Sequence, residues 1–397
     1  MPRDALPRDI VILSGARTAI GTFGGALAAV PPTETGAAVA RAALERAGVE
    51  GGRIGHVAYG HVINTEPKDM YLSRVASIGA GIPDTTPAMN VNRLCGSGAQ
   101  AIVSAAQAIA LGDCDYALAG GAEAMSRGPH ILPDARMGRK MGDVRALDMM
   151  IGALHDPFGH GHMGVTAENV AAEHQIGRAE QDAFALESQS RAARAISEGR
   201  FKSQIVPIEV TRGRDTVAFD TDEHPRPTTA EGLAGLKPAF KRDGSVTPGN
   251  ASGINDGAAA LVLAEAGAAE AAGLKPVARL LGYAHAGVRP EVMGLGPIPA
   301  VQRLMERTGL SVSDFDVVES NEAFAAQACA VNRGLGLDPA KVNPNGGAIA
   351  LGHPVGATGA IITVKCLYEL ERIGGRHGLV TMCIGGGQGI ALAIERL

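Results

Sequence analysis

The sequence predicts an α/β protein in which short buried strands alternate with helices in an open, doubly wound sheet. Three observations support this fold class. Short apolar runs recur along the chain, several of them closed by glycine, which is typical of buried parallel strands. Helical patterns separate these runs, as the connections of a parallel sheet require. Glycine accounts for 54 of the 397 residues without a three-residue period, which excludes collagen and fits many tight turns.

The first half of the chain contains strand and helix patterns in alternation. The first apolar run is closed by Gly15, and the helical pattern after it stops at Gly48, where glycine commonly caps a helix. The expected elements are strand Ile10–Ser14, helix Glu34–Ala47, strand His56–Tyr59, strand Ala88–Leu94, helix Ile102–Ala110 and strand Tyr116–Ala119.

The middle of the chain has a different composition. Between about Ala122 and Ala251, methionine, histidine, proline and charged residues become frequent. Ala179–Glu198 has the pattern of an isolated, strongly polar helix. We therefore expect an inserted, largely helical subdomain here.

From Ala278 the first pattern returns. The sequence after Cys95 (Cys-x-x-Gly-Ala, helix, strand, Gly-Gly) corresponds to the sequence after Gly356 (Gly-x-x-Gly-Ala, helix, strand, Gly-Gly). The simplest explanation is an internal duplication of one α/β unit. The expected elements are strand Arg279–Ala284, helix Ile298–Thr308, strand Val317–Glu319, helix Gly356–Leu370 and strand Leu379–Cys383.

Composition excludes several classes of protein. The net charge is −5 and aromatic residues make up only 3%, without tryptophan, which argues against a nucleic-acid or carbohydrate platform. The five cysteines lack C-x-x-C spacing, so we expect a reducing compartment and no disulfide framework. The uncharged stretches Leu94–Gly112 and Val342–Val364 are rich in small and polar residues, and no signal peptide is evident. We expect a soluble, cytoplasmic protein.

Cys95 is the first candidate for chemistry. It stands between a strand and a helix N-terminus, close to Gly96 and Gly98, which allow a ligand to approach the backbone. Unsatisfied N–H groups at such a position stabilise a thiolate and can bind an oxyanion. The alternative is a buried structural cysteine, the commonest role of a free cysteine.

Three further residues follow strands or lie in glycine-rich turns. Cys383 opens the sequence Ile384-Gly-Gly-Gly-Gln-Gly, which lies too near the C-terminus for a dinucleotide-binding unit and could instead line a cavity. His353 lies in Gly352-His-Pro-Val-Gly, and a surface histidine is the alternative reading. Asn321 follows a strand at its carboxyl end, where α/β sheets place their sites, although a helix N-cap explains it equally well.

Other candidates receive a structural interpretation. Cys114, Cys329 and Cys366 lie within apolar patterns. His155, His160 and His162 have no standard metal-ligand spacing and no completing partner, so no metal site is expected.

Taken together, six motifs resemble the signature set of the thiolases, in the right order over essentially the full chain. Within that family they look most similar to the biosynthetic-type bacterial β-ketothiolases. The motifs are Ser14-Gly-Ala-Arg-Thr-Ala-Ile-Gly-Thr-Phe-Gly-Gly, Asn92-Arg-Leu-Cys-Gly-Ser-Gly, Gly249-Asn-Ala-Ser-Gly-Ile-Asn-Asp-Gly-Ala-Ala, Asn321-Glu-Ala-Phe-Ala, Asn345-Gly-Gly-Ala-Ile-Ala-Leu-Gly-His-Pro-Val-Gly-Ala-Thr-Gly and Cys383-Ile-Gly-Gly-Gly-Gln-Gly.

The resemblance implies a fold and a domain division. It implies two duplicated βαβαβαββ core domains in a five-layer αβαβα arrangement. The N-terminal core would span residues 1–124 and be completed by 254–276, the inserted loop domain would span 125–253, and the C-terminal core would span 277–397.

The resemblance also implies catalytic roles. Cys95 would carry the acyl group as a thioester, and His353 would take its proton. Cys383 would act as acid and base at C2 of the second acyl-CoA. One oxyanion site would use His353 and a water positioned by Asn321, and the other the backbone N–H groups of Cys95 and Gly385. Sulfur suits this role because the acyl-enzyme remains isoenergetic with acyl-CoA.

For coenzyme A, the implied contacts follow motif position. Ser252 would meet the pantetheine amide, Arg226 the nucleotide phosphates and Phe240 the adenine end. The residues implied to line the tunnel are His162, Met163, Ala323 and Phe324. Coenzyme A thioesters are substrates, so no cofactor is expected.

The expected activity is acetyl-CoA C-acetyltransferase, a reversible condensation of two acetyl-CoA, with propionyl-CoA or longer acyl groups as further substrates. Family resemblance implies a homotetramer of dimers; no nucleic-acid or membrane partner is expected. A degradative 3-ketoacyl-CoA thiolase is the same-class alternative. The alternative from a different functional class is a non-catalytic carrier with this fold. Such a carrier would not need the residues Cys95, His353, Asn321 and Cys383, so their presence argues against it. Ketosynthases lack a second cysteine like Cys383.

Overall fold

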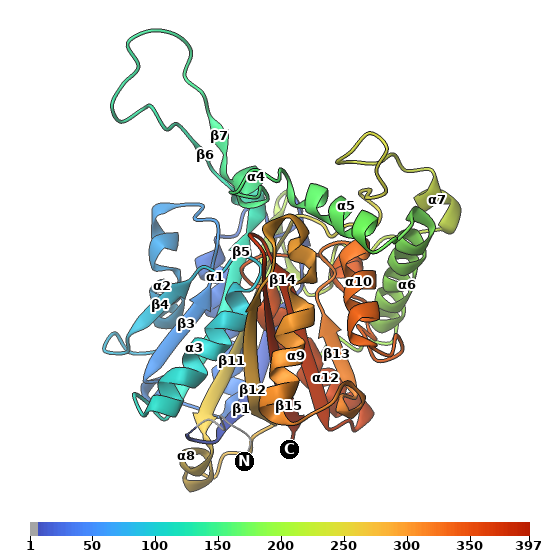
Figure 1. Cartoon of the computed structure of the whole chain (residues 1–397). Helices are drawn as coiled ribbons and strands as arrows, with labels where there is room; N and C mark the ends of the chain where they lie inside the picture. Colours follow the sequence, from blue (N-terminus) through green and yellow to red (C-terminus); the bar gives the residue numbers. More distant parts are fainter. Residues whose placement is uncertain (1–6) are drawn as a thin grey trace.

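The computed structural model describes residues 7–397 and is built on one large mixed sheet with helices on its faces (Figure 1). The strand order is β13-β14-β15-β12-β1-β11-β5-β3-β4, with β2 paired to β11 and β8 to β1. The sheet strands are β1 (Ile10–Thr18), β2 (Gly21–Thr22), β3 (His56–Gly60), β4 (Ala88–Val91), β5 (Tyr116–Ala124), β8 (Ile205–Val206), β11 (Asn255–Glu265), β12 (Ala278–Gly287), β13 (Val317–Ser320), β14 (His377–Ile384) and β15 (Gln388–Arg396).

The two halves of the chain repeat one topology. In the first half, β3 is parallel to β4 and β5, and β11 runs antiparallel between β5 and β1. In the second half, β13 is parallel to β14, and β15 runs antiparallel between β14 and β12. The counterpart of β4 is reduced to a parallel bridge between Val318 and Val342. Each half therefore reads βαβαβαββ, which confirms the predicted duplication.

Helices form three layers around the two halves of the sheet. In the middle, α3 and α12 pack against each other, and each contacts strands of both halves. On the outer faces, α1 packs on β1, β5 and β11, whereas α9 packs on β12 and β15. The core helices are α1 (Pro32–Ala47), α2 (Leu72–Gly79), α3 (Ser97–Leu111), α8 (Ala266–Ala271), α9 (Pro297–Thr308), α10 (Ala325–Leu335), α11 (Ala348–Leu351) and α12 (Thr358–Ile373).

The region between β5 and β11 lies across the carboxyl ends of the parallel strands (Figure 1). Its regular structure is mostly helical, as predicted, and the polar pattern corresponds to α6, but more of the region lies in loops than in helices. Two small hairpins, β6–β7 and β9–β10, were not predicted. Its elements are β6 (His130–Ile131), β7 (Leu147–Asp148), α4 (Met149–Ala153), α5 (Met163–Glu173), α6 (Arg178–Ser197), β9 (Ile208–Arg212), β10 (Asp215–Phe219) and α7 (Ala230–Ala234).

Two details differ from the sequence prediction. The antiparallel strands β11 and β15 were not predicted: β15 follows β14 without a helix between them, and β11 follows the inserted region rather than a core helix. Cys114 lies in the turn between α3 and β5 and is half-buried. The segment Leu94–Leu111 is long and apolar enough to cross a membrane by length and composition alone, but 72% of it is buried inside the fold, as in the core helix of a globular protein.

Candidate active site

A cavity of about 670 Å³ opens where the first half, the inserted region and the second half meet. Its wall contains most of the site residues named from the sequence: Cys95, His162, Met163, Arg226, Phe240, Ser252, Ala323, Phe324, His353 and Gly385. Asn321 and Cys383 are buried behind this wall. Residues distant in the sequence thus converge on one cavity.

Cys95 lies in a tight turn between β4 and α3. Leu94, just before it, has a φ of 45°, and the Ser97 hydroxyl holds the turn by accepting from Arg93 N (2.8 Å) and donating to Leu94 O (2.6 Å). Burial raises the pKa of the Cys95 thiol to about 11, while the N–H groups of Gly385 and of Cys95 itself lower it. The two N–H groups assigned to an oxyanion site therefore lie at the sulfur.

His353 is held at both its backbone and its ring. Its backbone N donates to Asn255 Oδ1 (2.9 Å). The Thr358 hydroxyl donates to Pro354 O (2.9 Å), so at 2.7 Å it must accept from His353 Nδ1. The lone pair is therefore on Nε2. Burial lowers the pKa of His353 to about 4, so the unliganded site holds a neutral imidazole and a neutral thiol.

Asn321 follows β13 directly, and its amide points at the histidine. Asn321 Nδ2 lies 3.4 Å from His353 Nε2. Within the described residues 7–397, its buried Oδ1 atom has no hydrogen-bond partner. A buried amide oxygen without a partner can accept a hydrogen bond from a water or substrate group next to the imidazole.

Cys383 is near the end of β14 and is completely buried. It belongs to an apolar cluster with Met163, Ala323 and Phe324. Burial raises the pKa of the Cys383 thiol far above its usual range, and a charge on Cys95 would raise it further. The two sulfurs therefore disfavour simultaneous ionisation.

The outer part of the cavity is aromatic. His162 caps α5 by accepting Gly164 N at its Nδ1 (3.0 Å), and its ring stacks on Phe240 with centroids 4.7 Å apart. A Cβ on Gly164 would lie 2.3 Å from the Phe240 ring, so only glycine fits there. Arg226 lies beside Pro248 O, to which it donates at 3.1 Å.

Sequence reasoning missed several residues of this site. Asn255 and Thr358, which fix His353, lie inside quoted motifs, but sequence alone gives no partner for a buried amide or hydroxyl. His224, which borders Asn255 at 3.3 Å, was also missed, as were the wall residues Phe23 and Met293. Residues 7–397 contain no group of three or more His, Cys, Asp or Glu side chains that could hold a metal ion.

Comparison with known protein families gives two matches that together span most of the chain. The family model described as "Thiolase, N-terminal domain" matches residues 10–267, and "Thiolase, C-terminal domain" matches residues 274–396. The chain is 62% identical to "Beta-ketothiolase BktB" of Cupriavidus necator, over 99% of this chain and 100% of that protein. It is 51% identical to an acetyl-CoA acetyltransferase of Chromobacterium violaceum, over 98% and 100%.

Solved structures with similar folds carry related names. The Bacillus anthracis acetyl-CoA acetyltransferase superimposes with a TM-score of 0.96 at 47% identity, covering 99% of this chain and 100% of that one. Human mitochondrial 3-ketoacyl-CoA thiolase, solved with CoA, gives a TM-score of 0.97 at 42% identity, covering both chains completely.

Proposed function

This chain belongs to the thiolase family, and from that premise we propose how it acts as an acetyl-CoA C-acetyltransferase of the biosynthetic type. It is an acyltransferase, and the proteins with the higher identities, from 50% to 62%, are named β-ketothiolase or acetyl-CoA acetyltransferase. The degradative name belongs to solved structures at 42% and 43% identity. The observation that best supports the proposal is the convergence of Cys95, His353 and Gly385 on one cavity.

In the first half-reaction, the Cys95 sulfur attacks the carbonyl carbon of acetyl-CoA. His353 Nε2, which carries the lone pair, takes the thiol proton and then gives it to the departing CoA sulfur. The N–H groups of Cys95 and Gly385 stabilise the oxyanion of the tetrahedral intermediate, since both lie close enough to the reacting sulfur to lower its pKa. The products are CoA and an acetyl thioester on Cys95.

In the second half-reaction, His353 Nε2 accepts the proton of the Cys383 thiol, and the resulting thiolate takes a proton from C2 of a second acetyl-CoA. The carbanion attacks the acetyl thioester, and the Cys95 thiolate leaves and recovers the proton held by His353. Acetylation of Cys95 removes its ability to carry a charge, and with it one of the effects that raise the Cys383 pKa. The Cys383 thiol therefore ionises more readily once the acyl-enzyme has formed. The protonated Nε2 of His353 and a water on Asn321 would donate hydrogen bonds to the enolate oxygen.

The proposal includes the substrate contacts and the domain division. His162, Met163, Ala323 and Phe324 would line the pantetheine tunnel, and Ser252 would meet its amide. Phe240 and Arg226 would contact the nucleotide end, which is supported by their place on the cavity wall. The two cores and the inserted region would have the boundaries 1–124 with 254–276, 125–253 and 277–397. Coenzyme A thioesters serve as substrates, so no resident cofactor is proposed.

Thiolysis rates should fall as the acyl chain lengthens. Next to Cys95, the buried side chains of Met125 and Val355 close the inner wall of the cavity. We expect the highest rate on four-carbon ketoacyl-CoA and measurable turnover of the five-carbon homologue. For chains of ten to sixteen carbons, the rate should be lower than the four-carbon rate by a factor of about ten or more. A panel of initial rates against chain length measures this. Equal or faster turnover of the long chains would favour the degradative alternative.

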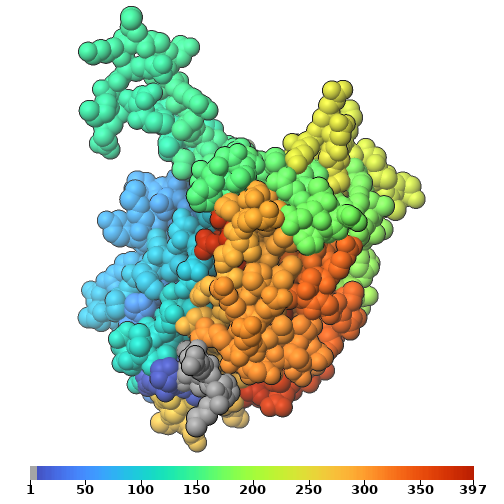
Figure 2. Space-filling view, in the orientation of Figure 1, coloured from blue at the N-terminus to red at the C-terminus, as the bar shows by residue number. Residues whose placement is uncertain are grey.

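The proposal also includes a homotetramer of dimers in the cytoplasm. All five cysteines are free. The segment from β6 to β7 extends away from the body (Figure 2), and Met137 and Met141 on it are 89% and 87% exposed. Methionines this exposed on a projecting arm fit a contact with another subunit.

Light scattering should therefore give about four times the monomer mass of 40.5 kDa. If the arm joins dimers, the double variant Met137→Asp, Met141→Asp should give a smaller species, because two buried charges would oppose the contact. A mass near 40 kDa for the parent protein would refute the assembly, whereas a tetrameric double variant would refute only the role of the arm.

A further inference from the structure

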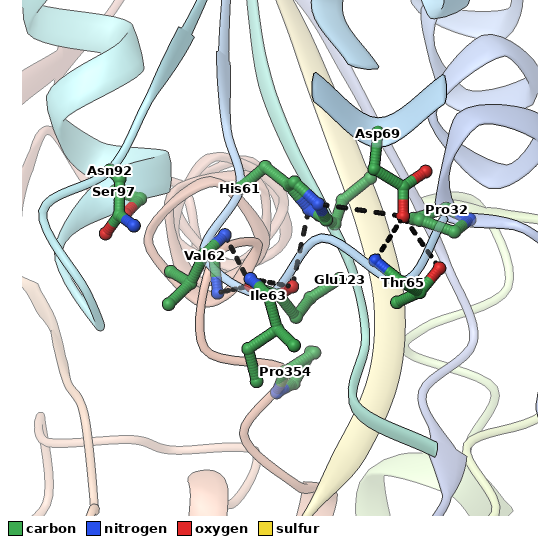
Figure 3. A network of polar contacts seen from close by, with 12 residues as sticks. Pro32, His61, Val62, Ile63, Thr65, Asp69, Asn92, Ser97, Glu123 and Pro354 are labelled. Carbon is green, nitrogen blue, oxygen red and sulfur yellow. Dashed lines mark hydrogen bonds and ion pairs between the residues drawn. The ribbon is translucent and has the colours of Figure 1, made fainter. Parts of the chain in front are cut away.

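Glu123 is a buried carboxylate beside the site that the mechanism above does not use. It is the penultimate residue of β5 and is 1% exposed. Its carboxylate accepts three backbone N–H groups, from Val62 (3.0 Å), Ile63 (3.1 Å) and Gly356 (2.9 Å). Figure 3 shows this carboxylate next to the segment after β3. One side chain thus joins three segments of the chain.

The bond to Gly356 is important because Gly356 ends the turn that carries His353. A Cβ on Gly356 would lie 2.4 Å from Glu123 Oε2. The Gly356 carbonyl oxygen packs equally closely against Gly60 and Gly121. A Cβ added to Gly60 would lie 2.4 Å from this oxygen, and a Cβ added to Gly121 would lie 2.5 Å from it. The turn that carries His353, in the second half, therefore packs directly against the backbone of the first half.

Cys95 belongs to the same first-half surface. It precedes α3, whose first turn contains Gly98, and a Cβ on Gly98 would lie 3.2 Å from the Gly356 carbonyl oxygen. The contacts at Gly356 consequently set the position of His353 relative to Cys95. Among these contacts, the hydrogen bond that involves a side chain is the one from Gly356 N to the Glu123 carboxylate.

His61 is the imidazole beside Glu123 within residues 7–397. Its Nδ1 lies 2.9 Å from Ala122 O and 3.3 Å from Glu123 Oε1, so Nδ1 must carry a hydrogen. Its Nε2 lies 4.0 Å from Asp69 Oδ2 and has no hydrogen-bond partner among these residues. Figure 3 shows the imidazole between the two carboxylates. No lysine or arginine of the described chain forms an ion pair with Glu123.

We propose that Glu123 is a positioning residue for the thiolase reaction, which holds the His353 turn at the correct distance from Cys95 and places a negative charge near the nucleophile. This inference rests on the proposed function. The titratable groups near this carboxylate are His61, with Asp69 on its far side, and Cys95. In agreement, the Glu123 charge raises the pKa of the Cys95 thiol.

Two substitutions separate geometry from charge. Glu123→Asp keeps the charge but is one methylene too short to reach all three N–H groups. Glu123→Gln keeps the length but removes the charge, and its NH₂ group must face another donor in either orientation. For both variants we expect the rate of Cys95 acetylation and kcat to fall about 10- to 10²-fold, with KM for acetyl-CoA within about twofold, because the reacting groups are misplaced rather than removed.

The charge has its own readout, the pH dependence of Cys95 alkylation by iodoacetamide in the unliganded enzyme. Only the thiolate reacts, so the parent rate should still be rising above pH 9. In Glu123→Gln the profile should move to lower pH, with the rate at pH 7 raised about threefold or more, while Glu123→Asp keeps the parent profile.

Glu168→Gln is the matched control. Glu168 on α5 is also a buried carboxylate, and it accepts Ser245 N (2.9 Å) and Val246 N (2.8 Å) without contacting the His353 turn. It should lose thermal stability but keep the parent acetylation rate and alkylation profile. If both Glu123 variants, measured as folded protein, match the parent in acetylation rate and alkylation profile, the inference is wrong. If the parent protein is not acetylated at Cys95, the proposed function itself fails.

Discussion

Replacement of Cys95 with alanine is expected to abolish both acetoacetyl-CoA formation and its thiolysis. The sulfur is the only group on the cavity wall that lies at the N–H groups of Cys95 and Gly385 and can carry an acyl chain as a thioester. The Cys383 sulfur does not have the N–H groups of Cys95 and Gly385 beside it, so it is not expected to take over the role. Removal of a nucleophile typically costs 10⁴-fold or more, so the residual rate should be undetectable in a routine assay.

Mass spectrometry after treatment with acetyl-CoA provides the direct measurement. The parent enzyme should gain one acetyl group on the peptide that contains Cys95, and Cys95→Ala should gain none. Cys114→Ala serves as the control, because Cys114 is half-buried in a turn away from the cavity and should be dispensable. Acetylation on another residue, or normal turnover by Cys95→Ala, would refute the mechanism.

The parallel part of the fold could be predicted from the sequence because its strands and helices alternate. The strands from Ile10, His56, Tyr116, Val317 and Leu379 were found within a few residues of their ends. The strands β11 and β15 were missed because each is buried along nearly its whole length and so shows no alternation of polar residues. In addition, no helix separates β15 from β14, with which it pairs antiparallel.

The site was less predictable than the fold. Cys95, His353, Asn321 and Cys383 stand out because each lies in a glycine-rich or strand-end motif. Their supporting contacts do not: Asn255, Thr358 and Glu123 act through partners about 98, 5 and 233 residues away. Sequence patterns reveal periodicity and local turns, whereas hydrogen bonds across the two halves depend on tertiary packing. A charged residue inside the apolar strand β5 was the one available sign of Glu123.

The two thiols should be separable by replacing Cys383 with serine. In the proposed mechanism, Cys95 alone carries the acetyl group, so Cys383→Ser should still be acetylated by acetyl-CoA. It should fail to exchange the C2 protons of the second substrate. Burial already raises the Cys383 pKa, and a hydroxyl in the same apolar surroundings is a far weaker acid than a thiol. Since general acid–base groups contribute about 10² to 10⁴-fold, condensation should slow by that factor.

The measurement combines three readouts on one variant: acetyl incorporation at Cys95, deuterium exchange at C2 of acetyl-CoA, and the condensation rate. Cys366→Ser is the matched control, because Cys366 is also completely buried but lies on α12 away from the cavity wall. It should lose stability through burial of a hydroxyl while condensing acetyl-CoA at the parent rate. Near-normal condensation by Cys383→Ser would mean that this thiol only fills space beside the glycine-rich loop. Loss of acetylation would instead place Cys383 in the first half-reaction, because the acyl-enzyme could then not form without it.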